Sequence, residues 1–283
     1  MFFLPLFDDN KSSRFPIVTI GLIIICALVF LGQISGSTMD QRIVIYAYGA
    51  IPAVITGHDY LPPDIAAIPP WLSLSTSTFM HGGWMHILGN MLFLWIYGDN
   101  VEDKMGRVKF LIFYLICGVV ASLTHVMIDP NSTVPLVGAS GAIAGVMAAY
   151  LLMFPRARIR VIMVIIIFIR FTYFPAFVVI GSWAALQVIA VPQSLSAEGG
   201  GVAYFAHIGG FMAGLALVPI FKRRDVPLLP KSQDVPDWQI APVPARQIKN
   251  EFVARYQRKP RRVDIPSSKK PSQRNGRSSG PWG

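Results

Sequence analysis

Apolar residues along the chain gather in long runs that short polar segments separate. A helix needs roughly 20 apolar residues to cross a membrane, and six runs approach that length: about 16–33, 83–99, 108–128, 138–154, 173–191 and 202–221. The apolar segment 159–169 is shorter, and Arg170 separates it from the next run. We interpret it as a buried or interfacial connection, with a seventh span as the alternative. The pattern thus predicts an all-α, polytopic membrane protein built as a bundle of six transmembrane helices.

The basic residues between the runs predict how the spans are oriented. One set of connecting segments carries nearly all of them: Lys11, Arg14, Lys104, Arg107, Lys109, Arg156, Arg158, Arg160, Lys222, Arg223 and Arg224. The opposite segments, 34–82, 129–137 and 192–201, carry a single basic residue, Arg42. Because cytoplasmic loops are enriched in Lys and Arg, both termini are expected in the cytoplasm. This alternation favours six spans over seven.

Composition agrees with a membrane protein. Of the 283 residues, 53% are hydrophobic and 14% are charged, whereas about a quarter of a soluble domain is charged. The net charge of +10 belongs to the segment from residue 222 onward, which has 15 Lys or Arg and 5 Asp or Glu. The rest of the chain is balanced, so its charge does not indicate nucleic-acid binding.

Three regions follow from this distribution: a cytoplasmic N-terminus (1–15), a six-span domain (16–222) and a basic cytoplasmic tail (223–283). The tail is rich in Pro, Ser, Lys and Arg, a composition typical of disorder. Its expected role is a solvated extension, or contact with the anionic inner leaflet. Cys26 and Cys117 lie inside apolar runs, so neither a disulfide framework nor a metal cluster is expected. The first run has no obvious cleavage site and is interpreted as a retained span.

A serine stands among small residues where the fourth run begins, in the segment 137–145 (VGASGAIAG). Two interpretations are open. Gly141 and Gly145 form a small-xxx-small pair that lets helices pack closely in lipid. Alternatively, the small neighbours leave room for a carbonyl beside the Ser140 hydroxyl, which would then need a base within reach.

His207 in the sixth run is the candidate base. A histidine inside a span is unfavourable, so it indicates either a function or a hydrogen bond to neighbouring backbone. The predicted topology starts the fourth and sixth runs on the outer side, which places Ser140 and His207 at depths that differ by only about 5 Å. Two glycine pairs allow the helices to approach closely: Gly141 with Gly145, and Gly210 with Gly214.

A third polar cluster opens the second run and contains His81, His86 and Asn90. His86 and Asn90 share one helix face because they are four residues apart, whereas His81 points elsewhere or precedes the helix. An imidazole and a carboxamide can donate hydrogen bonds to a developing oxyanion. Zinc binding and a purely structural network are the alternatives. Neither HExxH nor a carboxylate accompanies the cluster, which disfavours a metal.

Acidic residues are missing from the expected spans, with Asp99 at the end of one. A proton-coupled transporter usually needs a buried carboxylate relay, so that class is disfavoured. The same absence removes an acid that could complete a Ser-His-Asp triad. A catalytic site here would have to be a Ser-His dyad.

Four motifs together resemble those of the rhomboid intramembrane serine proteases. They are His81-x4-His86-x3-Asn90, Glu102-x3-Gly106, Gly138-Ala139-Ser140-Gly141 and Ala206-His207-x2-Gly210-x3-Gly214. Each motif alone is weak, but their order and spacing match the six-span core of the family over roughly residues 10–222. The resemblance implies a serine endopeptidase without metal or cofactor that cuts membrane-anchored proteins near the outer face of the membrane.

The resemblance also assigns roles to residues. Ser140 would be the nucleophile, His207 the general base, and His86 and Asn90 with the Ser140 amide the oxyanion hole. His81 would be structural or gating, and the four glycines Gly138, Gly141, Gly210 and Gly214 would support the site. Glu102 and Gly106 would shape the loop after the second span, and the fifth span, including Phe177 and Trp183, would move aside for substrate.

One position departs from the pattern of the family. Some rhomboids have an aromatic residue four positions after the serine that stacks on the catalytic histidine, but this chain has Ala144. His207 must therefore be held in another way, or less tightly. A non-catalytic rhomboid-like scaffold that binds transmembrane helices is the alternative function, and a bacterial plasma membrane is the expected location.

Overall fold

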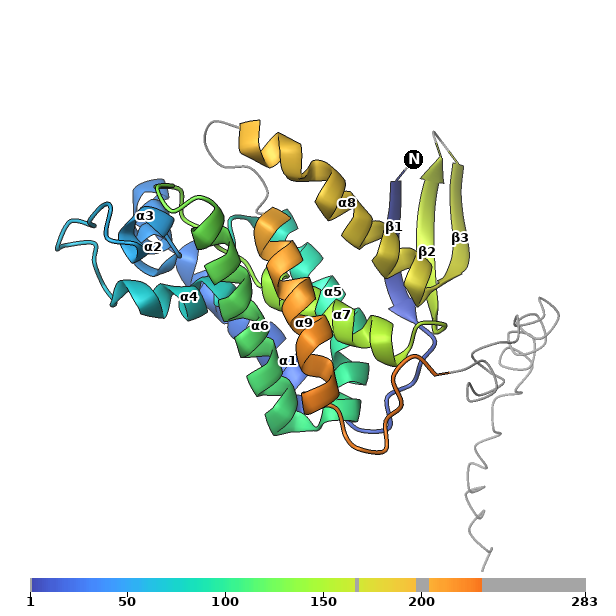
Figure 1. The fold of residues 1–283 in the computed structure, drawn as a ribbon. Coiled ribbons are helices and arrows are strands. Elements are labelled where there is room, and N and C mark those ends of the chain that lie inside the picture. Colours follow the sequence, from blue (N-terminus) through green and yellow to red (C-terminus); the bar gives the residue numbers. More distant parts are fainter. Residues whose placement is uncertain (1, 166–167, 197–203, 231–283) are drawn as a thin grey trace, which may run out of the picture. The chain divides into compact units, whose positions relative to one another are not determined.

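The computed structural model describes residues 2–165, 168–196 and 204–230, all within one compact unit that spans residues 1–240. The predicted tail lies outside the described residues from 231 onward, and the second unit, 241–283, is entirely outside them. Six long helices correspond to the six apolar runs (Figure 1): α1 (Ile17–Gln33), α5 (Trp84–Met105), α6 (Arg107–Ile128), α7 (Ser140–Met153), α8 (Ala176–Ser196) and α9 (Tyr204–Phe221).

The fold is that of a helical membrane protein. Among the described helices, α6 and α9 are both long and apolar enough to cross a membrane. The helices α1 and α7, and residues 176–192 of α8, are apolar but shorter. The number of six membrane crossings therefore stays a prediction.

Helix α7 forms the centre of the bundle and packs against α5, α6 and α9. Residues 141–150 of this helix are all buried, and small side chains predominate among them. With 14 residues, it rises about 21 Å, which is less than the roughly 30 Å thickness of the hydrocarbon core. The helix is therefore too short to cross that core by itself, and Ser140 is its first residue.

Short helices fill the segment between α1 and α5 and support the chain just before Ser140. They are α2 (Thr38–Tyr48), α3 (Pro52–Ile55), η1 (Pro70–Leu72), α4 (Ser73–Thr76) and η2 (Ser77–Phe79). Ala50 and Leu136 exchange two backbone hydrogen bonds of 3.0 and 2.8 Å, and the Gly138 amide donates to the Ser77 carbonyl at 2.9 Å. The approach to α7 is thus anchored at several points.

A three-stranded antiparallel sheet corrects the all-α prediction. It has the order β1 (Phe2–Asp8), β2 (Arg158–Ile165), β3 (Phe168–Pro175). Residues 159–165 and 168–169 of the expected buried or interfacial connection are therefore β-strands, and they do not form a seventh helical span. Their β-branched residues suit a pleated sheet, where alternate side chains face opposite sides. Ile159 and Val161 are fully buried, whereas the guanidinium of Arg160 lies over the rings of Phe7, Phe171 and Tyr173 on the other face.

Helix α5 also differs from the prediction, because it continues to Met105 instead of ending near residue 99. Its last turns contain acidic side chains whose carboxylates accept hydrogen bonds from other elements. The Glu102 carboxylate accepts hydrogen bonds from the Val18 amide at 3.1 Å and from the amide and hydroxyl of Thr19, both at 2.8 Å. Glu102 thereby accepts from amides that have no partner within the first turn of α1, where a negative charge is favourable. Gly106, with φ +86°, ends α5.

Candidate active site

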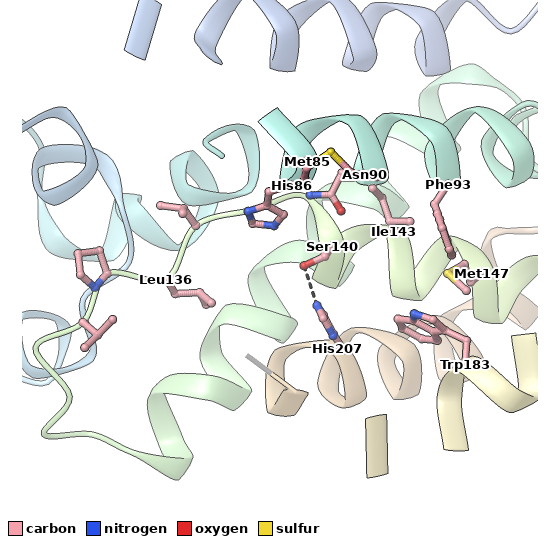
Figure 2. Close-up of a pocket in the computed structure, with 14 residues that line it drawn as sticks. Met85, His86, Asn90, Phe93, Leu136, Ser140, Ile143, Met147, Trp183 and His207 are labelled. Atoms are coloured by element: carbon pink, nitrogen blue, oxygen red, sulfur yellow. Dashed lines mark hydrogen bonds between the residues drawn. The ribbon is translucent and has the colours of Figure 1, made fainter. Parts of the chain in front are cut away.

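A cavity of about 550 Å³ lies at the end of the bundle where α7 begins. Its polar lining consists of His86, Asn90, Ser140 and His207, and apolar side chains such as Met147 and Trp183 complete the wall (Figure 2). These polar residues come from α5, α7 and α9. The structure thus brings four of the candidate residues to one cavity.

Ser140 and His207 are hydrogen-bonded to each other. The Ser140 Oγ lies 2.8 Å from Nε2 of His207, and Figure 2 shows the two side chains facing each other from α7 and α9. This distance is within the range expected between a nucleophile and its base. Ser140 is the first residue of α7, so its backbone amide is one of those without a partner inside the helix.

The close approach of α7 and α9 depends on glycines. A Cβ at Gly210 would overlap the carbonyl oxygen of Gly141, and a Cβ at Gly214 would overlap that of Gly145. A side chain at Gly141 itself would collide with Ala121 of α6. The glycines therefore determine the helix separation at which Ser140 meets His207.

Helix α8 holds the other edge of the His207 ring. The Nδ1 of His207 lies 2.7 Å from Oε1 of Gln187, and the Trp183 ring centroid lies 5.8 Å from that of His207. On α9 itself, Tyr204 contacts the histidine ring edge-to-face. These three residues hold His207 in the absence of an aromatic residue at Ala144. The sequence analysis missed Gln187, although a glutamine in an otherwise apolar helix was a signal.

His86 presents its Nε2 to the region beside Ser140. The Gly82 amide donates to Nδ1 of His86 at 3.3 Å, so in a neutral ring the proton is on Nε2. A Cβ on Gly138 would lie 2.8 Å from that nitrogen, and Gly138 has a φ of +133°. Both the space and the backbone conformation require glycine here.

Asn90 and His81 differ in their relation to the cavity. Asn90 lines it, and within the described residues its buried Nδ2 has no hydrogen-bond partner. His81 precedes α5 and does not line the cavity; its backbone exchanges hydrogen bonds with the Gln33 side chain. Its ring contacts that of His86 edge-on at 5.3 Å between centroids. Over the same described part of the chain, no group of His, Cys, Asp or Glu could hold a metal ion.

Comparison with known proteins identifies the family. The model of the rhomboid domain matches residues 69–224. The chain is 32% identical to the chloroplastic rhomboid-like protein 11 of Arabidopsis thaliana over 176 residues, 59% of this chain and 58% of that protein. It is 31% identical to the rhomboid protease GluP of Bacillus subtilis (strain 168) over 143 residues, 50% of this chain and 25% of that protein.

A further relative is the mitochondrial rhomboid protein 1 of Saccharomyces cerevisiae (strain ATCC 204508 / S288c), which is 31% identical over 150 residues, 51% of this chain and 40% of the relative. The matches thus span between a quarter and about three fifths of the lengths of these relatives. The relatives come from a bacterium, a mitochondrion and a chloroplast, so the bacterial plasma membrane stays a prediction.

Proposed function

Because the chain belongs to the rhomboid family, we propose that it is an intramembrane serine endopeptidase in which Ser140 is the nucleophile and His207 the general base. The observation that carries this proposal is the 2.8 Å hydrogen bond between Ser140 Oγ and His207 Nε2 at the wall of the cavity. A serine with only a packing role can bond a backbone carbonyl of its own helix and does not need a histidine as its partner.

The reaction follows from these positions. His207 Nε2 takes the hydroxyl proton while Ser140 Oγ bonds to the scissile carbonyl carbon. The carbonyl oxygen becomes an oxyanion. When that intermediate collapses, the C–N bond breaks and the proton on His207 goes to the leaving amine. Water then attacks the acyl-enzyme by the same route and releases the second product.

Three donors surround the position of the oxyanion in this proposal. They are the Ser140 amide, Nε2–H of His86 and Nδ2 of Asn90. The Asn90 donor is buried and unpartnered among the described residues, and an unused buried donor is unfavourable until a ligand accepts from it. The N-terminus of α7 adds a positive partial charge at the same place.

The substrates in this proposal are membrane-anchored proteins. A transmembrane helix hides its carbonyl groups in hydrogen bonds, so cleavage requires a segment that unwinds. We place the cut near the outer face of the membrane, with both termini of the enzyme in the cytoplasm, because the connecting loops at the Ser140 end carry almost no Lys or Arg.

The test is cleavage of a single-span model substrate by the protein reconstituted in liposomes. Wild type should cut near the outer boundary, whereas Ser140→Ala and His207→Ala should lose at least about a thousandfold in rate. Ser182→Ala is the matched control: Ser182 is a helical serine bonded to the Val179 carbonyl at 3.0 Å, outside the cavity.

Two outcomes would contradict the proposal. Equal cleavage by wild type and Ser140→Ala would make Ser140 a packing residue. Binding of transmembrane helices without cleavage, together with no labelling of Ser140 by a fluorophosphonate, would favour the non-catalytic scaffold.

A further inference from the structure

Gln187 is a buried polar side chain on α8 whose amide faces the candidate base. Its side chain and backbone together are only 9% exposed, and its neighbours on the helix are predominantly apolar. A buried amide in such surroundings is normally hydrogen-bonded at both ends. Both ends of this one have partners, on two different helices.

The direction of the Gln187 amide is determined by what its partners can do. Its Nε2 lies 3.2 Å from the backbone carbonyl oxygen of Trp183. A carbonyl can only accept, so the NH₂ group of Gln187 must be at this end. The amide cannot be reversed without placing two acceptors against each other. Oε1 therefore faces His207.

The same logic determines where His207 carries its proton. Oε1 of Gln187 can only accept, so the Nδ1 that lies 2.7 Å away must donate. A neutral imidazole with Nδ1–H has its lone pair on Nε2. That nitrogen is the one 2.8 Å from the Ser140 hydroxyl.

We propose that Gln187 is a positioning residue that keeps the proton of neutral His207 on Nδ1 and leaves Nε2 free to accept the proton of Ser140. The inference rests on the proposed function, in which His207 is the base. The hydrogen bonds run in one direction, from Ser140 through His207 and Gln187 to the Trp183 carbonyl.

A neutral amide suits this position better than a carboxylate. The acid of a Ser-His-Asp triad selects the histidine tautomer and also stabilises the imidazolium by its charge. An ionised acid inside a membrane span is unfavourable. Gln187 performs the first task without that charge. The rings of Trp183 and Tyr204 contact the His207 ring, but contact with an aromatic ring does not select one tautomer.

The decisive measurement is the ¹⁵N NMR spectrum of histidine-labelled protein, because nitrogen shifts distinguish the two neutral tautomers. It is made in the Ser140→Ala background, where the serine hydroxyl no longer influences the ring. The His207 signals are assigned by their loss in His207→Gln. With Gln187 present, neutral His207 should be protonated on Nδ1 alone.

Gln187→Met keeps the length of the side chain and removes the acceptor. In Ser140→Ala/Gln187→Met, a substantial Nε2–H population of His207 should appear. Leu186→Met is the matched control, since Leu186 is 53% exposed on the same helix, and it should leave the tautomer unchanged. Pure Nδ1–H in the Gln187→Met variant, or a mixture already present with Gln187, would overturn the proposal.

Kinetics separate this inference from the proposed function. In the otherwise wild-type enzyme, Gln187→Met should lower kcat at least about tenfold, with KM within about twofold, because substrate contacts are unchanged. A loss of kcat without a tautomer change would show a structural role and contradict the proposal. If the wild type cuts nothing while the NMR result holds, the protease function fails and the tautomer assignment stands.

Discussion

At the scale of single residues, the two histidines of the cavity have opposite tautomers. His207 donates from Nδ1 to Gln187, whereas His86 accepts at Nδ1 from the Gly82 amide. One ring therefore offers a lone pair at Nε2 and the other offers a proton there. The proposed base and the proposed oxyanion donor need these two states at the same pH, and local hydrogen bonds supply them.

His86→Phe tests the donor role of His86. Phenylalanine keeps an aromatic ring against His81 and removes Nε2–H. We expect kcat to fall by about a hundredfold while KM changes little, because the lost hydrogen bond is made only in the transition state. The measurement is steady-state cleavage of the single-span substrate.

His81→Phe is the matched control for that variant. Both ring nitrogens of His81 are buried without a hydrogen-bond partner among the described residues. Replacing them with carbon should therefore preserve activity and leave the melting temperature equal or higher. If His81→Phe is as inactive as His86→Phe, the loss reflects ring packing and not oxyanion stabilisation.

The sequence indicates the four polar residues that line the cavity but not Gln187, which contacts His207 from outside that lining. Ser140 and His207 follow from small-residue patterns and from similar predicted depths, and His86 and Asn90 from their helical spacing. Gln187 could not be assigned in this way. Its partner lies on another helix, and whether the two side chains meet depends on how α8 is rotated about its axis, which an almost uniformly apolar sequence does not determine.

At the scale of helices, the separation of α7 and α9 is set by glycine. Gly210→Ala would place a methyl group on the Gly141 carbonyl, so the helices must move apart. Overpacking of this kind destabilises by about 1–3 kcal/mol. We expect a lower melting temperature. We also expect the cleavage rate to fall at least about tenfold, which is about 1.4 kcal/mol in activation free energy, because Ser140 and His207 are drawn apart.

Gly181→Ala is the control for this substitution. It is the same change in another apolar helix, α8, but a Cβ at Gly181 has no heavy atom within 4 Å. It should leave both the melting temperature and the cleavage rate close to wild type. A Gly210→Ala enzyme as active as the Gly181→Ala enzyme would show that helix separation does not limit the Ser140–His207 bond.

Helix positions are predictable from apolar runs, but two features of the elements are not. The sheet joins residues 2–8 to residues 158–165, and pairing across such a separation leaves no local signal beyond β-branched residues. The sequence does not predict that α5 continues to Met105, because acidic residues normally end a membrane span. Here Glu102 pairs with the N-terminus of α1, which only the packed structure reveals.

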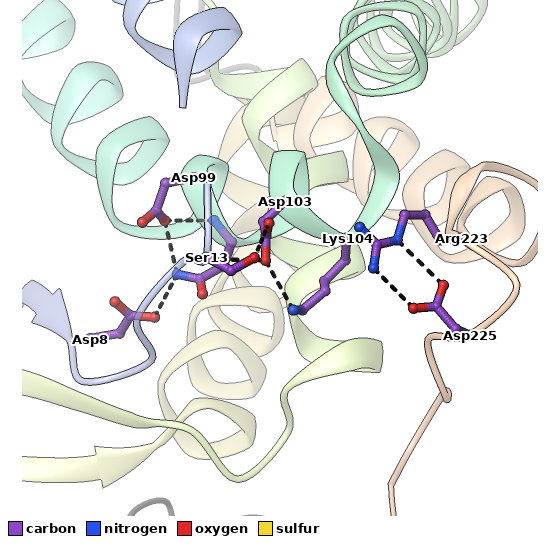
Figure 3. Close-up of polar contacts among 8 residues, drawn as sticks. Asp8, Ser13, Asp99, Asp103, Lys104, Arg223 and Asp225 are labelled. Carbon is purple, nitrogen blue, oxygen red and sulfur yellow. Dashed lines mark hydrogen bonds and ion pairs between the residues drawn. The ribbon is translucent and has the colours of Figure 1, made fainter. Parts of the chain in front are cut away.

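At the scale of the whole bundle, Asp8 connects the sheet to the helices. Its Oδ2 accepts hydrogen bonds from the hydroxyl of Tyr150 on α7 and from Nδ2 of Asn100 on α5, the latter at 3.1 Å. Figure 3 shows Asp8 at one end of a group of polar contacts that includes Asp99 and Asp103 of α5. Burial raises the pKa of Asp8 from 3.8 to about 7, and the nearby carboxylates of Asp99 and Asp9 act in the same direction. The attachment of β1 is therefore sensitive to pH.

The sign of this effect follows from proton binding. The unfolded chain releases the Asp8 proton near pH 3.8, whereas the folded protein retains it to about pH 7. Between these values the folded state binds more protons, so the contribution of Asp8 to the free energy of unfolding falls as the pH rises. The stabilisation that protonated Asp8 contributes is complete below pH 3.8 and is lost above about pH 7.

Asp8→Asn should remove this part of the pH dependence, because an amide keeps the acceptor oxygen for Tyr150 and Asn100 and does not ionise. Melting temperatures in detergent at about pH 5 and about pH 8 should differ less for Asp8→Asn than for wild type, and the variant should be the more stable at the higher pH. Asp64→Asn, at an exposed carboxylate, should behave as wild type. Equal pH dependence in wild type and Asp8→Asn would mean that the connection between sheet and helices holds regardless of the charge on Asp8.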